Sequence, residues 1–566
     1  MISASERRET ASRVLVSHNA SRFEGYQSGE RFYMPTIDVA SASQLRFARQ
    51  ARLWALLCLV VLLPPAVSEA GAEPGLAGVV VVQARSSSGD HLRDAAAALE
   101  KGEVESAERF VRAELRIHPR SAAASNLLGF ILIRRGELDP AEASFRRALD
   151  ISPTYVPALI NMGNLYLATG RPGEAASQFE RAVAADPNSG PAQAGWSEAC
   201  LTRGRYAEAV THLDRAREID SSNPQFLVAL LNALLKAGQL DRAWSVLAEV
   251  SEANGSTPEV LVDLARVLAD NNHNDRALAL LQRASLRESK KYDLEYTLGL
   301  VLYKLGRKNE AERELGLAAA VRPDAPAAQF ALGLAQAALG KEEDAAASFA
   351  RAVDLQPSYA EAHFELGKLY FSHGNYQASV NAFTRAAIAR PAVPMYQASL
   401  GDAYYYLGQV DRAREAYKAA YKLDASANSI NFKIGLLELR LGRYGDAEIY
   451  LKREIELHPD NADCYSTLGE LFLVLGREAD ADQALKQALA ARPSHASALY
   501  QMGKLRTRQQ RYDEATRAFE RVIELDHSNA QVHYQLFLIY RRTGREDLAA
   551  KEIEIFQKME RDAKRP

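Results

Sequence analysis

Apolar side chains recur along most of this chain in a pattern that repeats every 34 residues. Within residues 156–187 they stand at the three- and four-residue spacing of one helix face, pause at Gly170, and resume the same spacing until Pro187. This pattern predicts two short antiparallel helices joined by a turn. Neither helix buries its apolar stripe alone, so each pair needs a copy of itself on both sides. The sequence therefore predicts an all-α solenoid of stacked helix pairs.

The repeat begins near Ser88 and continues to residue 563 as fourteen units without an insertion. With each unit numbered from 1 at its first residue, position 20 is alanine in thirteen units and Ser379 in the other. Position 8 is glycine in nine units. Small residues at these two places indicate that the helices of a pair cross in close contact, because a larger side chain would overpack the crossing at a cost of about 1–3 kcal/mol.

Turn residues mark the ends of the predicted helices. Position 15 is glycine in twelve units, and the exceptions are Asn272 and Gln510. Glycine directly after a helix adopts the left-handed conformation without a steric penalty, and asparagine is its usual substitute, so the first helix should end here. Gln510 does not fit this rule. Proline at position 32 of eight units predicts the end of the second helix.

The spacing of particular residues also resembles a known family. Met162-Gly163, Tyr166, Ala175, Phe179, Ala182 and Pro187 stand in the order and at the period of the tetratricopeptide repeat family. The resemblance implies a right-handed superhelix whose first helices line a concave groove. It also implies a protein that binds partners and does not catalyse a reaction.

Residues 190–291 keep the 34-residue frame but lose two of its markers. Position 8 becomes Ser197, Leu231 and Ala265, and no proline stands at position 32. Sequence drift and a functional hinge both explain this irregularity. Asn254-Gly-Ser256 lies in the same region and is a formal glycosylation acceptor.

The N-terminal region has the layout of a secretory signal. Three arginines precede the apolar run at residues 53–63, Pro64-Pro65 ends it, and small residues follow at 70–72. We predict a signal peptide region at 34–72 that exports the chain to the periplasm, the cell envelope or the medium. An uncleaved membrane anchor at 53–63 is the alternative, although this run is shorter than the roughly 18 residues of a spanning helix. Residues 1–33 are interpreted as a mis-assigned upstream extension ahead of Met34 or a disordered tail, and residues 73–87 as a flexible linker.

Charge and composition exclude several classes of function. Lys plus Arg number 69 and Asp plus Glu number 72, with the two signs interspersed, which argues against a nucleic-acid partner. Of the three cysteines, Cys200 and Cys464 are expected to be buried free thiols. The sequence holds no phosphate-binding loop, metalloprotease helix, paired C-x-x-C or nucleophile elbow. We therefore expect no enzymatic activity, no cofactor and no metal.

The groove implied by the resemblance supplies the candidate binding residues. Positions 5, 9 and 12 share one face of the first helix, and aromatic residues with two lysines gather there in the later units. These candidates are Tyr296, Tyr303, Phe330, Phe364, Lys368, Phe371, Tyr405, Phe432, Tyr500, Lys504 and Tyr534. Earlier units carry smaller or aliphatic residues at position 5, such as Asn126 and Ala194. The aromatic residues either bind an extended peptide or polymer, or pack between neighbouring helices.

These observations favour an exported scaffold or adapter with a protein, peptide or polymer partner. Two alternatives remain. One is a repeat arm related to the O-linked N-acetylglucosamine transferases that acts with a separate catalytic chain, because Asn161 to Tyr166 resemble their repeats. The other is a co-chaperone-like peptide binder, for which residues 326–427 offer only Lys368 as a groove cation.

Overall fold

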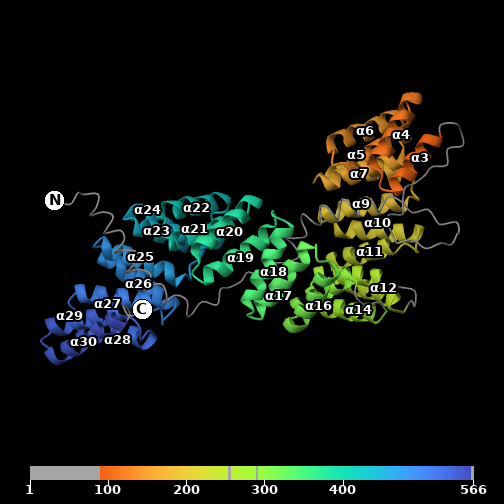
Figure 1. Cartoon of the computed structure of the whole chain (residues 1–566). Coiled ribbons are helices and arrows are strands. Elements are labelled where there is room, and N and C mark those ends of the chain that lie inside the picture. The colour runs from red at the N-terminus through yellow and green to blue at the C-terminus, as the bar shows by residue number, and fades with distance from the viewer. Residues whose placement is uncertain (1–88, 253–256, 288–290, 563–566) are drawn as a thin grey trace. The chain divides into compact units, whose positions relative to one another are not determined.

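The structure is a computed structural model of the chain and describes residues 89–252, 257–287 and 291–562. These residues form twenty-eight α-helices, α3 to α30, and one short 3-10 helix, without a β-strand among them (Figure 1). The predicted signal region, the linker and the Asn254 acceptor lie outside the described residues. None of the described helices combines the length and apolarity that crossing a bilayer requires.

The helices alternate as the 34-residue pattern predicts. The first helices of the units are α3 (Gly89–Glu100), α5 (Ala122–Arg134), α7 (Val156–Ala168), α9 (Gly190–Thr202), α11 (Pro224–Lys236), α13 (Pro258–Asp270), α15 (Tyr292–Lys304), α17 (Pro326–Ala338), α19 (Ala360–Ser372), α21 (Pro394–Tyr406), α23 (Ile430–Arg440), α25 (Ala462–Val474), α27 (Ala496–Arg508) and α29 (Ala530–Arg542). A 3-10 turn, η2 (Ala427–Ser429), precedes α23.

The second helices are slightly longer. They are α4 (Val104–Ile117), α6 (Leu138–Ile151), α8 (Pro172–Ala185), α10 (Tyr206–Ile219), α12 (Leu240–Glu252), α14 (Asn274–Arg287), α16 (Lys308–Val321), α18 (Glu342–Leu355), α20 (Tyr376–Ala389), α22 (Val410–Leu423), α24 (Tyr444–Leu457), α26 (Glu478–Ala491), α28 (Tyr512–Leu525) and α30 (Glu546–Asp562).

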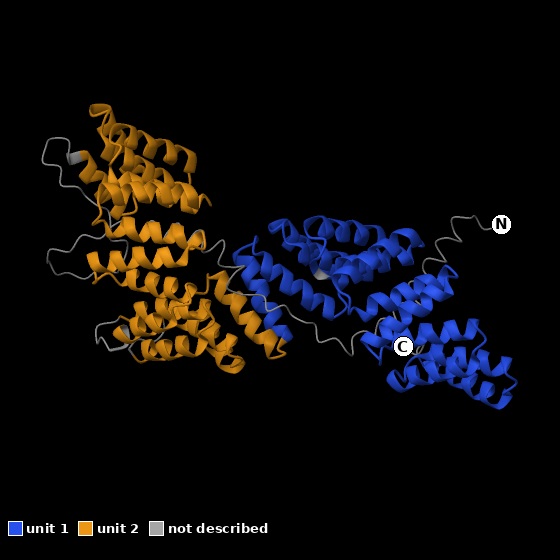
Figure 2. Cartoon of the chain, turned by 180° about the vertical axis from the view of Figure 1, so that it is seen from behind, with its two compact units in different colours: residues 1–33, 342–566 blue, residues 34–341 orange. Residues whose placement is uncertain are grey.

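The described helices fall into two compact units that divide between Lys341 and Glu342 (Figure 2). We call the helices α3 to α17 the N-terminal body and the helices α18 to α30 the C-terminal body. Each body is by itself a solenoid in which helices that are neighbours in sequence pack against one another. The all-α repeat fold predicted from the 34-residue pattern is thereby confirmed.

Glycine at position 8 lets the two helices of a unit approach closely. A Cβ atom added to Gly163 would lie 2.7 Å from the ring of Phe179, and one added to Gly367 would lie 2.5 Å from the ring of Phe383. Position 20 is fully buried in the units from Ala107 to Ala515 and 2% exposed at Ala549. The close crossing inferred from these small residues is therefore confirmed, and it is the same in both bodies.

The turn residue at position 15 is left-handed in every unit. The twelve glycines have φ between +70° and +79°, while Asn272 has φ +64° and Gln510 has φ +60°. Gln510 therefore follows the common turn although it lacks the freedom of glycine. A non-glycine residue in this conformation costs about 1–2 kcal/mol, which the packing of the flanking helices must offset.

The irregular units at 190–291 retain both the frame and the core. One apolar cluster continues from α9 through α17, with Leu231 and Ala265 fully buried in it. In α9 the small residue that faces Phe179 is Gly195, two positions before the lost glycine, and a Cβ there would lie 2.2 Å from the ring. The core thus tolerates the lost markers. That this region acts as a hinge stays a prediction.

The two described cysteines are free and buried, as expected. Burial raises the pKa of the Cys200 thiol, and it raises the pKa of Cys464 still further, assisted there by the nearby charges of Glu454 and Asp463. Both thiols are therefore protonated near neutral pH, and we expect them to be unreactive core residues.

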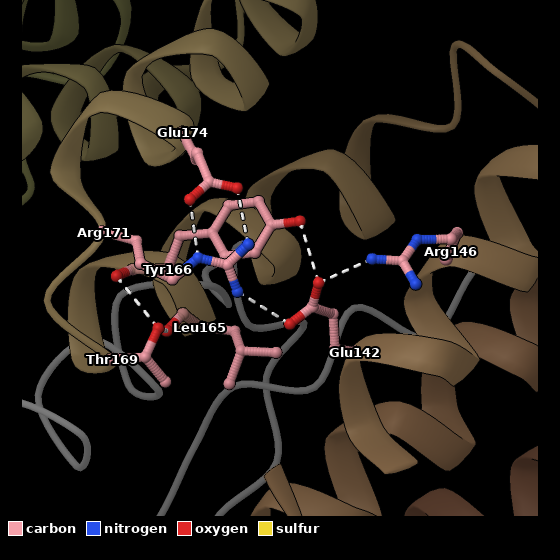
Figure 3. Close-up of polar contacts among 7 residues, drawn as sticks. All are labelled: Glu142, Arg146, Leu165, Tyr166, Thr169, Arg171 and Glu174. Carbon is pink, nitrogen blue, oxygen red and sulfur yellow. Dashed lines mark hydrogen bonds and ion pairs between the residues drawn. The ribbon is translucent and has the colours of Figure 1, made fainter. Parts of the chain in front are cut away.

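A polar latch joins the consecutive units 2 and 3 (Figure 3). Glu142 of α6 accepts hydrogen bonds from the Tyr166 hydroxyl at 3.2 Å, from Arg171 at 2.9 Å and from Arg146 at 2.6 Å. The Arg171 guanidinium also lies 4.1 Å from the centre of the Tyr166 ring and pairs with Glu174. These contacts bind the second helix of one unit to both helices of the next.

The same latch recurs further along the chain with other residues. Arg477 reaches Glu448 at 2.8 Å and lies 4.3 Å from the ring centre of Phe472. At the next junction, Arg506 takes the place of the aromatic ring and contacts Asp482 at 2.5 Å. At these three junctions, acidic residues of a second helix hold the next unit in place.

Candidate functional site

The predicted groove residues are divided between the two bodies. Tyr296, Tyr303 and Phe330 belong to the N-terminal body. The C-terminal body holds the other eight, which are Phe364, Lys368, Phe371, Tyr405, Phe432, Tyr500, Lys504 and Tyr534. The predicted groove residues therefore form a separate group in each body.

Three of the predicted aromatic residues are buried. Phe330 is 7% exposed, Phe364 is 5% exposed and Tyr500 is 9% exposed. The Phe364 ring lies 5.4 Å from Phe383 and 5.0 Å from Tyr396, and the Tyr500 ring lies 5.7 Å from Phe519. These rings pack between helices, and their surfaces are largely unavailable to a ligand.

The other predicted aromatic residues are half-buried. Tyr296 stacks on Tyr292 with ring centres 5.5 Å apart, and Tyr534 contacts Phe537 and Phe556. Tyr303 and Phe432 pack against the apolar clusters of their own bodies. Each of these side chains keeps part of its surface exposed, so its role in binding stays a prediction.

The two predicted lysines lie beside the buried rings. Lys368 forms an ion pair with Glu365 at 2.7 Å, and its ammonium group is 5.7 Å from the centre of the Phe364 ring. Lys504 has the same relation to Tyr500, also at 5.7 Å. A peptide carboxylate that approached Lys368 would have to compete with Glu365.

Four partly exposed aromatic residues of units 9 and 10 form one cluster, which we call the turn-side aromatic cluster. It consists of Phe371 at the end of α19, Tyr376 at the start of α20, and Tyr405 and Tyr406 at the end of α21. Tyr406 lies 5.0 Å from Tyr376, 5.1 Å from Phe371 and 5.8 Å from Tyr405. Tyr406 is itself 36% exposed. The cluster therefore offers aromatic surface in an already ordered arrangement.

Polar groups complete this surface. Burial raises the pKa of Tyr405, and it raises the pKa of Tyr406 to about 12, so both phenols remain hydrogen-bond donors at neutral pH. One turn before Tyr406, Asp402 pairs with Lys433 at 2.6 Å and accepts a 2.8 Å hydrogen bond from Tyr417. Apolar rings and an ion pair on neighbouring first helices suit a peptide, which presents both kinds of group.

Sequence reasoning found half of this cluster and missed the other half. Phe371 and Tyr405 occupy position 12, one of the predicted groove positions, whereas Tyr406 and Tyr376 occupy positions 13 and 17. The run Tyr404-Tyr405-Tyr406 was the available signal. Tyr376 could not be placed beside it without the geometry of the turn between α19 and α20.

The described residues show no assembled metal site, because no group of three His, Cys, Asp or Glu side chains is arranged to hold an ion there. What the bodies present is an extended helical surface with aromatic and paired polar side chains. Such a molecule is a helical-repeat protein of the kind that generally serves as a non-catalytic interaction scaffold.

Comparison with known families identifies the repeat. A tetratricopeptide repeat family model matches residues 160–224, 296–360, 338–394, 399–462, 466–515 and 500–557. Three further tetratricopeptide repeat models match residues 120–188, 201–266 and 258–283. The chain belongs to the tetratricopeptide repeat family, a family whose repeats mediate protein–protein interactions. No curated protein matches it.

Several solved structures are similar to this chain. The crystal structure of the APC/C hetero-tetramer Cut9-Hcn1 is 13% identical, covers 82% of this chain and 96% of its own, and has a TM-score of 0.36. A tetratricopeptide repeat protein from Parabacteroides merdae is 18% identical, with 44% and 98% covered and a TM-score of 0.36. MamA protein is 22% identical, with 30% and 94% covered and a TM-score of 0.28.

Proposed function

We propose that this chain is a non-catalytic adapter that binds an extended protein segment on the first-helix face of its C-terminal body. The turn-side aromatic cluster carries the proposal, because aromatic rings that are ordered yet partly exposed supply much of the binding energy in protein interfaces. Its rings hold one another in place, so a partner would lose little entropy in ordering them.

The proposal also assigns a role to the neighbouring first helices. The Asp402–Lys433 pair lies next to the cluster and would hydrogen bond to the backbone or polar side chains of a bound segment. The other half-exposed predicted residues, Phe432 and Tyr534, would extend the contact toward the C-terminus. Phe364 and Tyr500 would support this face from beneath, since both are buried.

Capture of partners from the native envelope fraction, using the full chain as bait, tests the proposal. Tyr376→Ala combined with Tyr406→Ala should reduce capture of specific partners by about tenfold or more, because two interface aromatics are lost. The control is Tyr206→Ala. Tyr206 occupies the same position of its unit as Tyr376, is 36% exposed as Tyr406 is, and lies in the N-terminal body.

The results separate three cases. Loss of capture only in the cluster variant supports the proposal, provided that its unfolding midpoint is unchanged. Equal capture by both variants contradicts it. Capture of a separate glycosyltransferase chain, insensitive to both variants, would favour the transferase-arm alternative.

We also propose export, with cleavage of the signal between about Ser68 and Ala72. The order of basic, apolar and small residues supports this proposal. N-terminal sequencing of the native protein checks it. A full-length chain recovered in the membrane pellet after carbonate extraction would favour an anchor at 53–63 instead.

A further inference from the structure

Helix α20 differs in charge from the other second helices. Its sequence, YQASVNAFTRAAIA, has no acidic residue, whereas each of the other second helices in the described residues contains at least one. Its only charged side chain is Arg385. The outward ion pairs that typify this side of the solenoid are therefore missing from α20.

Two depressions flank α20 on this side of the C-terminal body. The first has a volume of about 530 Å³ and lies between α18, α19 and α20. The second has a volume of about 890 Å³ and lies between α20, α21 and α22. Both are lined by Pro357, Asn381 and Arg385, so these residues form a ridge between two hollows. Volumes of this size accommodate several side chains of a partner.

Arg385 lacks the hydrogen bond that the equivalent arginines of units 2 and 3 make. The equivalent arginines of units 2 and 3 donate hydrogen bonds to the proline carbonyl of the preceding unit, Arg147 to Pro119 at 2.8 Å and Arg181 to Pro153 at 3.1 Å. In unit 9 the matching carbonyl, that of Pro357, accepts instead from His363 Nε2 at 3.1 Å.

The consequence is an exposed guanidinium that the protein itself does not use. Burial lowers the pKa of His363, and the positive charge of Arg385 lowers it further, so the imidazole is neutral and donates its Nε2–H to the carbonyl. Arg385 is left exposed beside it. An arginine in this state presents five donors suited to a carboxylate.

The second depression is positive and partly apolar. Its lining contains Arg385 and Arg412 and no acidic residue. Arg412 is held in place by Gln409 at 2.9 Å and lies 5.8 Å from the ring centre of Tyr404. Ile388, on the same helix face as Arg385, is 72% exposed. An exposed isoleucine that lines the same depression as two arginines matches a partner with both apolar and acidic groups.

We propose that the outer face of α20 is a second docking surface, for a protein segment that carries a carboxylate next to an apolar side chain. The carboxylate lies between Arg385 and Arg412, and the apolar side chain covers Ile388 and Val380, which line the same depression. None of the residues that line the two depressions belongs to the turn-side aromatic cluster of the proposed function. The protein thus has two binding faces in one body, and the proposal stands whether or not the first face binds.

Two synthetic peptide pools test the proposal against the full chain. The acidic pool consists of twelve-residue peptides with Asp or Glu adjacent to Leu, Ile or Phe in a serine background, and the basic pool has Lys in place of every acid. Binding is measured by fluorescence anisotropy. We expect the acidic pool to bind and Arg385→Glu to weaken its binding about tenfold or more, because charge-assisted hydrogen bonds are replaced by repulsion.

Arg351→Glu is the matched control. Arg351 occupies the same position of unit 8 as Arg385 does in unit 9, is also exposed, and lines neither depression. It should leave binding unchanged, as should Tyr406→Ala on the other face. Ile388→Ser should weaken binding without altering the unfolding midpoint, because the side chain is already in water.

Three results would overturn the proposal. One is equal binding of the acidic and basic pools. Another is that the Arg385→Glu variant binds the acidic pool as tightly as the unmodified protein does. The same holds if only Tyr406→Ala weakens binding, because the peptides would then bind at the turn-side aromatic cluster. The third is a wild-type dimer in sedimentation that Ile388→Ser dissociates, which would make a second copy of the chain the occupant.

Discussion

Units 2 and 3 (residues 122–189) and units 9 and 10 (residues 360–427) have the same kind of helix crossing in their cores, but their surfaces differ. In both regions a glycine on the first helix contacts a phenylalanine ring on the second, Gly163 with Phe179 and Gly367 with Phe383. Around that common crossing, units 2 and 3 use their outward charges in the latch formed by Glu142 (Figure 3). Units 9 and 10 leave Arg385 and Ile388 exposed.

The difference indicates which positions of a repeat are available for binding a partner. Positions 8, 15 and 20 are set by helix crossing and turn geometry, and they vary little because each unit must fit its neighbours. The remaining surface positions are free to join units or to meet partners. Where a surface side chain makes no contact within the protein, we infer that it is available to bind a partner.

The largest expected effect concerns a predicted groove residue that proved to be core. Phe364→Ala should reduce the free energy of unfolding by about 3–5 kcal/mol, because a buried ring that packs on Phe383 and Tyr396 leaves a cavity. Denaturant unfolding with hydrogen exchange on residues 360–427 would measure it. A change below about 1 kcal/mol would show that the ring is not part of the core.

Overpacking the helix crossing should affect both regions alike. Gly163→Val and Gly367→Val should each cost about 1–3 kcal/mol, since the added atoms meet a phenylalanine ring. Gly316→Ala in α16 is the control, because a Cβ there meets nothing within 4 Å. It should stabilise the helix by up to about 1 kcal/mol. A clearly different loss of unfolding free energy at positions 163 and 367 would contradict the claim that both regions have the same helix crossing.

Removal of a latch should distinguish the two surfaces. Glu142→Ala should cost about 1–2 kcal/mol, because it leaves Tyr166 and Arg171 without their shared acceptor. Arg385→Ala should change stability by less than about 0.5 kcal/mol, since that side chain holds nothing in place. Thermal unfolding of the two variants gives the comparison. A loss at Arg385 as large as that at Glu142 would mean that Arg385 is structural.

The smallest effect is a dependence on pH. Burial lowers the pKa of His363 in unit 9, and likewise that of His212 in α10, from the ordinary value of 6.5. Because the unfolded chain binds these protons more readily, the stability contributed by both histidines is complete above pH 6.5 and is lost as the pH falls below it. Ring-proton titration by NMR should give midpoints below 6.5 for both. A midpoint above this value for His363 would contradict its buried, neutral assignment.

The fold could be predicted almost completely because its determinants are periodic. The 34-residue spacing specified the helix pairs, and the left-handed turn extends even to Gln510, whose side chain gave no sign of it. In that case the packing of the flanking helices overrides the local preference of one residue.

The surface was less predictable because exposure depends on neighbours far away in sequence. Position 5 contains buried Phe364 and half-exposed Phe432 under the same helical spacing. Arg385 could not be singled out from Arg147 or Arg181, since all three occupy the same position. Only the structure shows that the Pro357 carbonyl, which corresponds to the acceptor of Arg147 and Arg181, accepts its hydrogen bond from His363.

Hydrogen exchange of the full chain, with and without a partner captured with it as bait, tests the central claim most directly. We predict protection at residues 371–376 and 402–409, which contain the turn-side aromatic cluster and Asp402. The Glu142 latch in units 2 and 3 should be unaffected. Protection confined to residues 89–341, with no change at the cluster, would contradict the claim that the C-terminal body binds the partner.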